Sequence, residues 1–359
     1  MKKVLLCPLD WGIGHASRCV PVIRRLREAG LEVIIAADNR PFEFLRKEFP
    51  DLRMIRFPGQ KIRYPKGSGF LWKMILTAPS FFSSFREEHK KLREIVESCG
   101  ADIVISDNRY GCWHPVKPSV FITHQLEIQV PRSMGFLQRT VRNVLYRKIR
   151  HYGECWIPDF EIHRGIAGNL SHPDHLPENA HYIGILSRFA LRNFEVEDAV
   201  SPSFDLMVML SGPEPQRSIL EEKIMRQLLN ITLKAVIVRG ITESDEASVI
   251  DGHIHIFSHL ETNLMQEYMR RSALIVARSG YSTIMDMITL GKPAIFIPTP
   301  GQTEQEYLAR YLMEKKIFFS MPQKSFDLIY AIELSKNFPG MVIRNDYQAL
   351  AERIRSLIQ

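Results

Sequence analysis

The loop at residues 10–18 places a histidine beside two closely spaced glycines. Its sequence is Asp10-Trp11-Gly12-Ile13-Gly14-His15-Ala16-Ser17-Arg18. Glycines let a backbone turn tightly and approach a ligand, and the helix expected at 16–29 directs its N-terminal amides toward an anion. A histidine at that position can act as a general base near neutral pH. We therefore expect Gly12 and Gly14 beside a bound ligand and His15 as a general base, with a helix-capping or hydrogen-bonded histidine as the alternative.

A dinucleotide-binding fingerprint is the obvious rival for this loop. That motif needs a third glycine, and Ser17 stands in its place. It also needs an acidic residue about 20 positions further on, which Asp38 matches only weakly. The loop therefore does not predict a nicotinamide or flavin enzyme.

A second cluster follows another apolar run, at residues 278–286. The strand expected at 273–280 ends in a serine–glycine turn, and a helix should follow with Asp286 about two turns inside it. Amides at the start of that helix suit a diphosphate, and a carboxylate further along can accept two ribose hydroxyls. The residues expected to bind this diphosphate and ribose, at what is called the donor site below, are Arg278, Ser279, Gly280, Ser282, Thr283 and Asp286.

Two further loops add to the donor site. Glu304 and Gln305 begin a helix after the Ile297-Pro298 turn, where they could hydrogen-bond sugar hydroxyls. Ser211 and Gly212 lie at the end of the strand expected at 204–212, where it enters a turn, and are a candidate phosphate contact. Each residue alone could be a helix cap or a surface residue, but their spacing together indicates a nucleotide-sugar site.

The elements that must position these loops alternate between short apolar strands and helices. Such βαβ alternation predicts parallel sheets covered by helices on both faces. The expected strands lie at 4–9, 31–38, 101–107, 118–124, 204–212, 233–240, 253–258, 273–280 and 293–298. Helices are expected at 16–29, 217–229 and 347–358.

The alternation stops near residue 183 and restarts at 204, which predicts two domains. We expect an N-terminal acceptor-binding domain at 1–185, a linker at 186–202 and a nucleotide-sugar-binding domain at 203–340. Residues 341–359 would form a C-terminal helix that packs back on the first domain. Two doubly wound α/β domains bind ligands at the carboxyl ends of their strands.

The motifs resemble those of the MurG-type family 28 glycosyltransferases, and more closely a branch of that family that starts with G-x-G-H-A-S/T-R. The resemblance spans nearly the whole chain and is most specific at 273–310, where RSGYSTIMD, GKPAIFIP and Gln305 follow the family's order and spacing. It implies the GT-B fold, two Rossmann-like domains that face each other across a cleft. It also implies a UDP-sugar donor held by the second domain.

The resemblance carries over to individual residues. Asp286 matches the acidic residue that binds the ribose, and Gln305 matches a glutamine at the donor sugar. Ser211 and Gly212 match the phosphate loop, and Ser258 and His259 lie where backbone groups contact the uracil. His15 matches the histidine near the acceptor.

The chain also departs from the family pattern. The ribose ligand is normally the longer glutamate, and SGPEP replaces a glycine-rich phosphate loop. The peptidoglycan acceptor motif is replaced at 123–127 by Thr-His-Gln-Leu-Glu. We therefore expect a relative with another acceptor.

Four polar residues follow strands of the first domain. Asp107 and His124 stand at strand ends, where they could line the acceptor site, with hydrogen bonding in local turns as the alternative. For Asp38 and His114 the sequence does not decide between these two roles.

Charge and composition limit the class of protein. The chain carries 47 Lys+Arg and 40 Asp+Glu, a net charge of +7, and the excess lies in the first 160 residues. Five scattered cysteines favour reduced thiols and not a disulfide framework or zinc site. Since no run is long and apolar enough for a signal peptide or a membrane span, we expect a cytoplasmic enzyme. Basic segments with interleaved aromatics at 61–95 and 134–151 favour attachment to the inner face of the membrane, with a pair of helices packed on the sheet as the alternative.

The expected reaction is transfer of a hexose or N-acetylhexosamine from a UDP-sugar, the co-substrate, to a lipid, lipid-linked or other envelope-glycan acceptor. Inversion of configuration follows from the resemblance. No DxD motif stands in a suitable loop, so we expect no required metal and no cofactor. The alternatives are a UDP-sugar epimerase of the same fold, or a non-catalytic protein that binds a nucleotide sugar or nucleic acid. No nucleic-acid module is recognisable. The sugar, the acceptor and the oligomeric state do not follow from the sequence.

Overall fold

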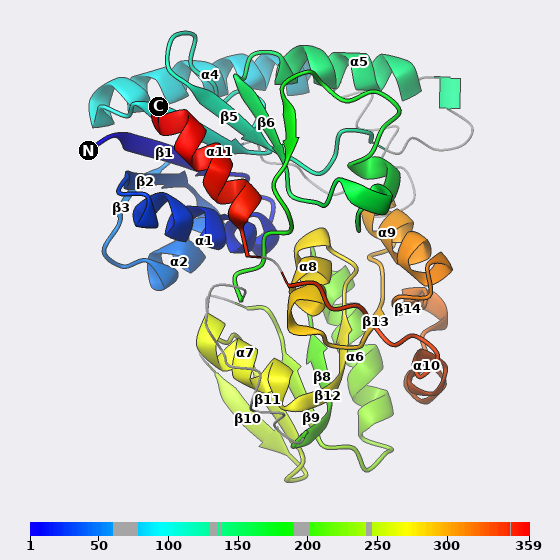
Figure 1. Ribbon diagram of the computed structural model, residues 1–359. Coiled ribbons are helices and arrows are strands. Elements are labelled where there is room, and N and C mark those ends of the chain that lie inside the picture. Colours follow the sequence, from blue (N-terminus) through cyan, green and yellow to red (C-terminus); the bar gives the residue numbers. More distant parts are fainter. Residues whose placement is uncertain (60–77, 129–134, 137, 190–201, 242–245, 345) are drawn as a thin grey trace. The chain divides into compact units, whose positions relative to one another are not determined.

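A computed structural model describes residues 1–59, 78–128, 135–136, 138–189, 202–241, 246–344 and 346–359 (Figure 1). The described residues form two compact units. Met1–Leu186 and Asn345–Gln359 make up the first unit, and Ser187–Arg344 the second. Most of the linker expected at 186–202 lies outside the described residues.

The first unit is built on a parallel sheet in the order β3-β2-β1-β4-β5-β6-β7. Its central strands are buried on both faces, which explains their continuous apolar runs. The strands are β1 Lys3–Pro8, β2 Glu32–Ala37, β3 Arg53–Arg56, β4 Ile103–Asp107, β5 Ser119–Ile122, β6 Glu154–Ile157 and β7 Ala180–Tyr182. Its helices are α1 Ile13–Glu28, α2 Asn39–Glu48, α4 Ala78–Cys99, α5 Gln138–Ile149 and the C-terminal α11 Gln348–Ile358.

The second unit repeats this plan in the order β10-β11-β9-β8-β12-β13-β14. Its strands are β8 Phe204–Met209, β9 Ala235–Val238, β10 Ala247–Ile250, β11 Ile254–Phe257, β12 Ser272–Ala277, β13 Ala294–Phe296 and β14 Phe319–Ser320. Its helices are α6 Gln216–Leu228, α7 Thr262–Arg270, α8 Tyr281–Leu290, α9 Thr303–Glu314 and α10 Leu328–Ser335. Short 3₁₀ turns lie at Ile162–Arg164 and Gly168–Leu170 in the first unit and at Gln323–Ser325 in the second.

One edge of the second sheet differs from the parallel arrangement expected. β10 pairs antiparallel with β11. The two strands are joined at Asp251 and Gly252, whose φ angles are 51° and 71°. An Asp-Gly pair with positive φ at both positions is typical of a hairpin turn, so this edge follows local turn chemistry.

The C-terminal helix α11 packs on α1 within the first unit (Figure 1). Tyr347, Leu350 and Ile354 are buried in this contact region. Arg353 Nη2 donates to Glu154 Oε1 at 2.9 Å, which ties the helix to β6. The last residues of the chain therefore complete the first unit.

Candidate active site

The two strands at the centre of the first sheet bring two distant loops together. β1 and β4 are neighbours, with Pro8 in register with Asp107 and Leu9 N donating to the Asp107 carbonyl at 3.0 Å. The chain turns to opposite sides of the sheet from these strands, and ligands of open α/β sheets bind at such a switch point. The loop at 10–18 and the end of β4 therefore share one site.

Gly12 determines how α1 enters this site. Its φ is 144° and its ψ is 173°, a conformation open to glycine and closed to residues with a Cβ. α1 begins at the next residue, so His15 lies in its first turn. Without glycine at this position, the helix would enter at a different angle.

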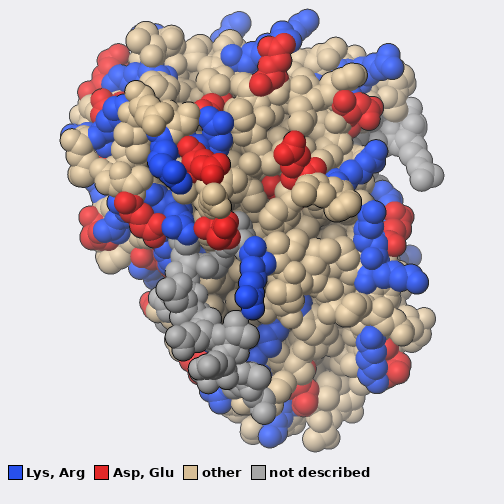
Figure 2. All heavy atoms as spheres, in the orientation of Figure 1, with Lys and Arg blue, Asp and Glu red and all other residues tan. Residues whose placement is uncertain are grey.

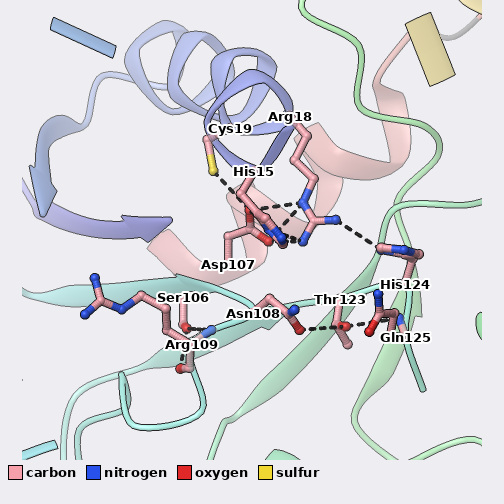
Figure 3. Close-up of polar contacts among 10 residues, drawn as sticks. All are labelled: His15, Arg18, Cys19, Ser106, Asp107, Asn108, Arg109, Thr123, His124 and Gln125. Atoms are coloured by element: carbon pink, nitrogen blue, oxygen red, sulfur yellow. Dashed lines mark hydrogen bonds and ion pairs between the residues drawn. The ribbon is translucent and has the colours of Figure 1, made fainter. Parts of the chain in front are cut away.

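Asp107 is the centre of a buried polar cluster (Figure 3). Its side chain is fully buried. Arg18 Nε donates to its Oδ1 at 2.9 Å and its Oδ2 at 3.0 Å, and Arg18 Nη2 also contacts Oδ1. Burial by itself raises the pKa of Asp107, but Arg18 and then His15 outweigh it and lower the pKa to about 2. Asp107 is therefore an anion at neutral pH.

His15 is the partly exposed member of this cluster. Its side chain is 20 % exposed, and its Nδ1 lies 3.1 Å from Asp107 Oδ2 and 3.0 Å from Arg18 Nη2. A histidine with one ring nitrogen on a buried carboxylate can take a proton on the other nitrogen and remain stabilised while charged. Burial and then the Asp107 carboxylate raise the pKa of the neighbouring Cys19 thiol, so it stays neutral.

His124 joins the cluster from the loop after β5. It is buried, and its Nδ1 lies 3.0 Å from Arg18 Nη1. Thr123 joins the loops after β4 and β5, because its Oγ1 donates to Asn108 Oδ1 at 3.2 Å and accepts from Gln125 N at 3.1 Å. The structure thus brings together His15, Asp107 and His124.

Asp38 and His114 each contact nearby parts of the first unit, and within the described residues neither is hydrogen-bonded or ion-paired to the Asp107 cluster. Asp38 pairs with Arg56 at 3.3 Å at the start of α2. His114 Nδ1 accepts from Val116 N at 3.2 Å and Lys117 N at 3.1 Å, a turn hydrogen bond of the kind considered from the sequence. Arg18 holds the cluster together, and we did not expect this role from the sequence. Its position three residues after His15 could have indicated it, because residues at this spacing share a helix face.

The second unit places the expected donor residues at the carboxyl end of its own sheet. β8 and β12 are neighbours, with Met209 in register with Ala277, and β13 follows on the other side of β12. The loops after these three strands lead into α6, α8 and α9. As in the first unit, this edge is a switch point of the sheet.

The start of α8 provides the helix N-terminus expected for a diphosphate. Gly280 is its N-cap, and Ile284 N donates to the Gly280 carbonyl at 3.0 Å. Ser282 and Thr283 are partly exposed in the first turn. Amides at this end of a helix favour negative charge.

Arg278 and Ser279 face the protein interior. Arg278 Nη1 donates to the carbonyls of Ile297 (3.1 Å) and Pro298 (3.3 Å), and its Nη2 donates to that of Gln216 (2.8 Å). Burial lowers the pKa of Arg278 to about 10, which leaves it charged at neutral pH. Ser279 Oγ donates to the Gln305 carbonyl at 2.9 Å. These contacts join the three loops, and a direct contact of either side chain with a ligand stays a prediction.

Glu304 and Gln305 lie in the first turn of α9 and are partly exposed. Gln305 Oε1 accepts from Thr299 N at 2.8 Å, which fixes the orientation of its amide group. The amide nitrogen is the end of the side chain left to contact a sugar hydroxyl in the predicted arrangement.

Asp286 is buried in the second turn of α8, at 4 % exposure. Ser187 Oγ donates to its Oδ1 at 2.6 Å. Burial raises the pKa of Asp286 to about 6, against the opposing effects of Arg188 and Ser187. A ribose would have to share this carboxylate with Ser187, and the ribose contact stays a prediction.

The start of α6 already holds an internal carboxylate. Glu214 accepts from Ser218 N at 3.3 Å and Ser218 Oγ at 2.8 Å, and from Arg217 Nε at 2.6 Å. Ser211 is exposed, and Gly212 has a φ of 101°. Negative charge at this helix end favours α8 over α6 as the site of a diphosphate.

Ser258 and His259 follow β11. Ser258 N donates to the Glu246 carbonyl at 2.9 Å, and the Ser258 carbonyl accepts from Ile241 N at 2.8 Å. His259 is partly exposed. Since both backbone groups of Ser258 are engaged, the predicted base contact would fall to His259.

Within the described ranges, no three His, Cys, Asp or Glu side chains are grouped closely enough to hold a metal ion. No helix in the described part of the chain is both long and apolar enough to cross a membrane.

Comparison with protein-family models identifies the glycosyltransferase family 28 C-terminal domain at residues 221–341. Among curated proteins, an N-acetylglucosamine transferase of Methylobacterium sp. (strain 4-46) is 34 % identical over 333 residues, covering 88 % of this chain and 82 % of the relative. Its full name is UDP-N-acetylglucosamine–N-acetylmuramyl-(pentapeptide) pyrophosphoryl-undecaprenol N-acetylglucosamine transferase. An uncharacterised glycosyltransferase of Methanosarcina acetivorans is 24 % identical over 335 residues, covering 86 % and 81 %.

Among solved structures, MurG of Acinetobacter baumannii superimposes with a TM-score of 0.59 at 14 % identity, covering 99 % of this chain and all of the other. This likeness confirms the expected fold of two parallel-sheet α/β units, GT-B.

Proposed function

The chain belongs to glycosyltransferase family 28, as an enzyme similar to its MurG-like members, and we propose that it transfers a hexose or N-acetylhexosamine from a UDP-sugar to a lipid, lipid-linked or other envelope-glycan acceptor. The proposal includes inversion at the anomeric carbon and no required metal ion or cofactor. The observation that carries it is the hydrogen-bonding distance between His15 Nδ1 and the buried Asp107 carboxylate, at the switch point of the first sheet.

His15 is the base in this proposal. Its Nε2 takes the proton of an acceptor hydroxyl as the acceptor oxygen forms a bond to the anomeric carbon. The bond from that carbon to the diphosphate breaks at the same time, and its electron pair leaves with UDP. Asp107 stabilises the charged imidazole, because it is ionised and lies 3.1 Å from Nδ1.

The donor would bind at the carboxyl edge of the second sheet. The N-terminus of α8 stabilises the leaving diphosphate through oriented amides, without a mobile counter-ion. Arg217 and Arg278 would contribute to the electrostatic field at the diphosphate without contacting it directly. Arg217 is paired with Glu214 and Glu221, and Arg278 donates to backbone carbonyls. Asp286 and the Gln305 amide would contact the ribose and the sugar.

A lipid-linked acceptor is supported by the charge of the first unit. α5 carries Arg139, Arg142, Arg147 and Lys148, with Ile149 as its buried residue. Phe136, just before it, is 79 % exposed. Lys and Arg side chains lie along the upper edge of the view in Figure 2, where Figure 1 places α4 and α5. This combination suits peripheral binding to an anionic membrane surface. Of the other basic segment, 61–95, residues 61–77 lie outside the described residues.

Thermal unfolding tests the donor site. A ligand that binds only the folded state raises Tm. We expect UDP to stabilise the protein more than GDP or CMP, and more than dUDP, which lacks only the ribose 2′-hydroxyl. Asp286→Ala should abolish the difference between UDP and dUDP, while the exposed control Asp251→Asn should retain it. Equal shifts with every nucleotide, or none, would contradict a UDP-sugar donor.

Release of UDP tests the reaction. With a UDP-sugar and a polyprenyl-phosphate-linked acceptor, His15→Gln should lower kcat by a factor of about 10²–10⁴, the usual contribution of a general base. His114→Gln is the matched control, because that ring is engaged in a local turn. An isomerised UDP-sugar in place of free UDP would instead support the epimerase.

A further inference from the structure

Arg18 lies at the centre of the polar cluster of the first unit. It is 2 % exposed and donates from all three guanidinium nitrogens. Nε contacts Asp107, Nη1 contacts His124, and Nη2 contacts both Asp107 and His15 (Figure 3). An arginine side chain can donate hydrogen bonds but never accept them. Its position therefore restricts where its neighbours carry their protons.

For His124 the restriction leaves one arrangement. Nη1 lies 3.0 Å from His124 Nδ1, so Nδ1 must offer a lone pair. A neutral ring then carries its proton on Nε2. A protonated ring would set an N–H donor against the guanidinium N–H, with two positive charges in contact, so the ring stays neutral.

For His15 two neighbours compete for the same nitrogen. Asp107 Oδ2, 3.1 Å from Nδ1, requires a proton there, whereas Arg18 Nη2, at 3.0 Å, requires a lone pair. Nη2 already has a charged partner in Asp107 Oδ1. A lone pair on Nδ1 would face an ionised carboxylate oxygen, which is the less favourable contact. Nδ1 therefore carries the proton, and Nε2 offers the lone pair.

We propose that Arg18 is a positioning residue that, together with the Asp107 carboxylate it binds, gives the two histidines opposite hydrogen-bonding roles. Asp107 holds the proton on Nδ1 of His15, so that His15 offers an accepting Nε2, and Arg18 holds the lone pair on Nδ1 of His124, so that His124 offers a donating Nε2–H. The arrangement of protons stands on the geometry of the cluster. Its meaning for catalysis rests on the proposed transferase function, in which an accepting Nε2 is the condition for His15 to act as a base.

Histidine-selective ¹⁵N NMR of the full chain measures the proton positions without any need for activity. Signals can be assigned with His15→Gln and His124→Gln. In wild type we expect Nδ1 of His15 and Nε2 of His124 to show the shifts of protonated nitrogens. The same tautomer in both rings, or a proton on Nδ1 of His124, would overturn the proposal even if no Arg18 variant could be purified.

Arg18→Lys tests whether Arg18 determines the tautomer of His124. A single ammonium can pair with Asp107 but cannot also contact both rings, so His124 should show a mixture of tautomers. We expect kcat to fall at least tenfold and the KM for the donor to stay within twofold. Arg24→Lys is the control on the same helix as Arg18: it loosens the ion pair of Arg24 with Glu48 of α2 (2.5 Å) and should leave the His124 tautomer, kcat and KM unchanged.

The outcomes separate this inference from the proposed function. An unchanged His124 tautomer in Arg18→Lys would overturn the positioning role. If the wild-type tautomers are as expected but no sugar is transferred from any donor, the transferase proposal fails and the assigned proton positions stand.

Discussion

Two buried aspartates, one in each unit, have pKa values shifted in opposite directions. Asp107 meets the Arg18 guanidinium through two nitrogens, and this contact outweighs the effect of burial. Asp286 has a serine hydroxyl at hydrogen-bonding distance, and there burial outweighs the more modest influence of Arg188. The same residue type is thus an anion throughout the neutral range in one unit and titrates near pH 6 in the other.

The first prediction concerns Asp107→Asn. The amide cannot balance the Arg18 charge, and removing one partner of a buried ion pair costs about 3–5 kcal/mol. Because the folded pKa is lowered from 3.8 to about 2, about 2.5 kcal/mol of the stability from Asp107 is present above pH 4 and lost as pH falls through 2. Urea unfolding should show the wild-type advantage at pH 7 shrinking below pH 4. Asp102→Asn, at an exposed carboxylate with one backbone bond, should cost under about 1 kcal/mol, and an equal cost would contradict the argument.

The second prediction is that Asp286→Asn stabilises the protein at neutral pH. A raised folded pKa means that the folded state binds more protons between pH 3.8 and about 6, so stability falls as pH rises through that window. The cost is about 3 kcal/mol above pH 6 and absent below pH 4. The isosteric amide resembles the protonated acid and still accepts from Ser187, so it should remove this slope.

Asp251→Asn is the control for that measurement, because an Asn-Gly turn suits the hairpin as well as Asp-Gly does. Its pH dependence of unfolding should match that of wild type. An Asp286→Asn protein that is less stable than wild type at pH 8 would show that the carboxylate is stabilising in its charged form.

At the scale of elements, Gly12 sets the entry of α1. Gly12→Ala forces a Cβ into a backbone conformation with φ of 144°, which costs about 1–3 kcal/mol, although the space around it is open. The N-terminal turn of α1 would relax by moving, and His15 would move with it. We expect a lower Tm and a fall in kcat of tenfold or more. Gly14→Ala, inside the helix and without a positive φ, is the control for stability alone and should not lower Tm.

The elements predictable from the sequence are those with long apolar runs. β1, β4, β8 and β12 were expected within two or three residues of their observed ends, because each contains a run of at least three consecutive buried residues. β3, with partly or fully exposed residues, and β14, with two residues, carry no such pattern and were not predicted. The antiparallel β10 depends on the turn at Asp251 and Gly252, and the apolar periodicity of the sheet does not encode it.

The site shows a similar division. Strand-end positions indicated Asp107 and His124, because the carboxyl ends of parallel strands meet at one edge. Contacts between a side chain and a distant carbonyl cannot be inferred from spacing. Arg278 was expected at the donor site, and the hydrogen bonds of its guanidinium to the carbonyls of Ile297, Pro298 and Gln216 could not be read from the sequence. Likewise, Ser187 is far from Asp286 in sequence, and only the fold shows their hydrogen bond.

At the scale of the whole molecule, the uneven charge of the chain bears on which unit would bind a membrane surface. In the proposed function, the enzyme takes a lipid-linked acceptor and would bind the membrane surface through the unit that holds the proposed base, His15. Here the unit with His15 also carries the basic helix α5 and the exposed Phe136. Lys and Arg near an anionic surface each contribute about 1 kcal/mol to binding, and salt screens the effect.

The last prediction follows from that charge. Wild-type protein should float with vesicles that contain anionic lipid and much less with neutral vesicles, and added salt should release it. Reversing three exposed cations of α5 and its C-terminal flank, Arg139, Arg147 and Arg150, to glutamate should abolish flotation. Reversing three exposed cations of the second unit, Lys316, Lys324 and Lys336, changes the net charge equally and should leave most of the binding. Equal loss in both variants would mean that net charge and not α5 directs attachment. Equal recovery with anionic and neutral vesicles would contradict an electrostatic surface altogether. Release of UDP from the donor, measured with a soluble, short-chain acceptor, does not depend on vesicles, so surface binding and sugar transfer can be judged separately.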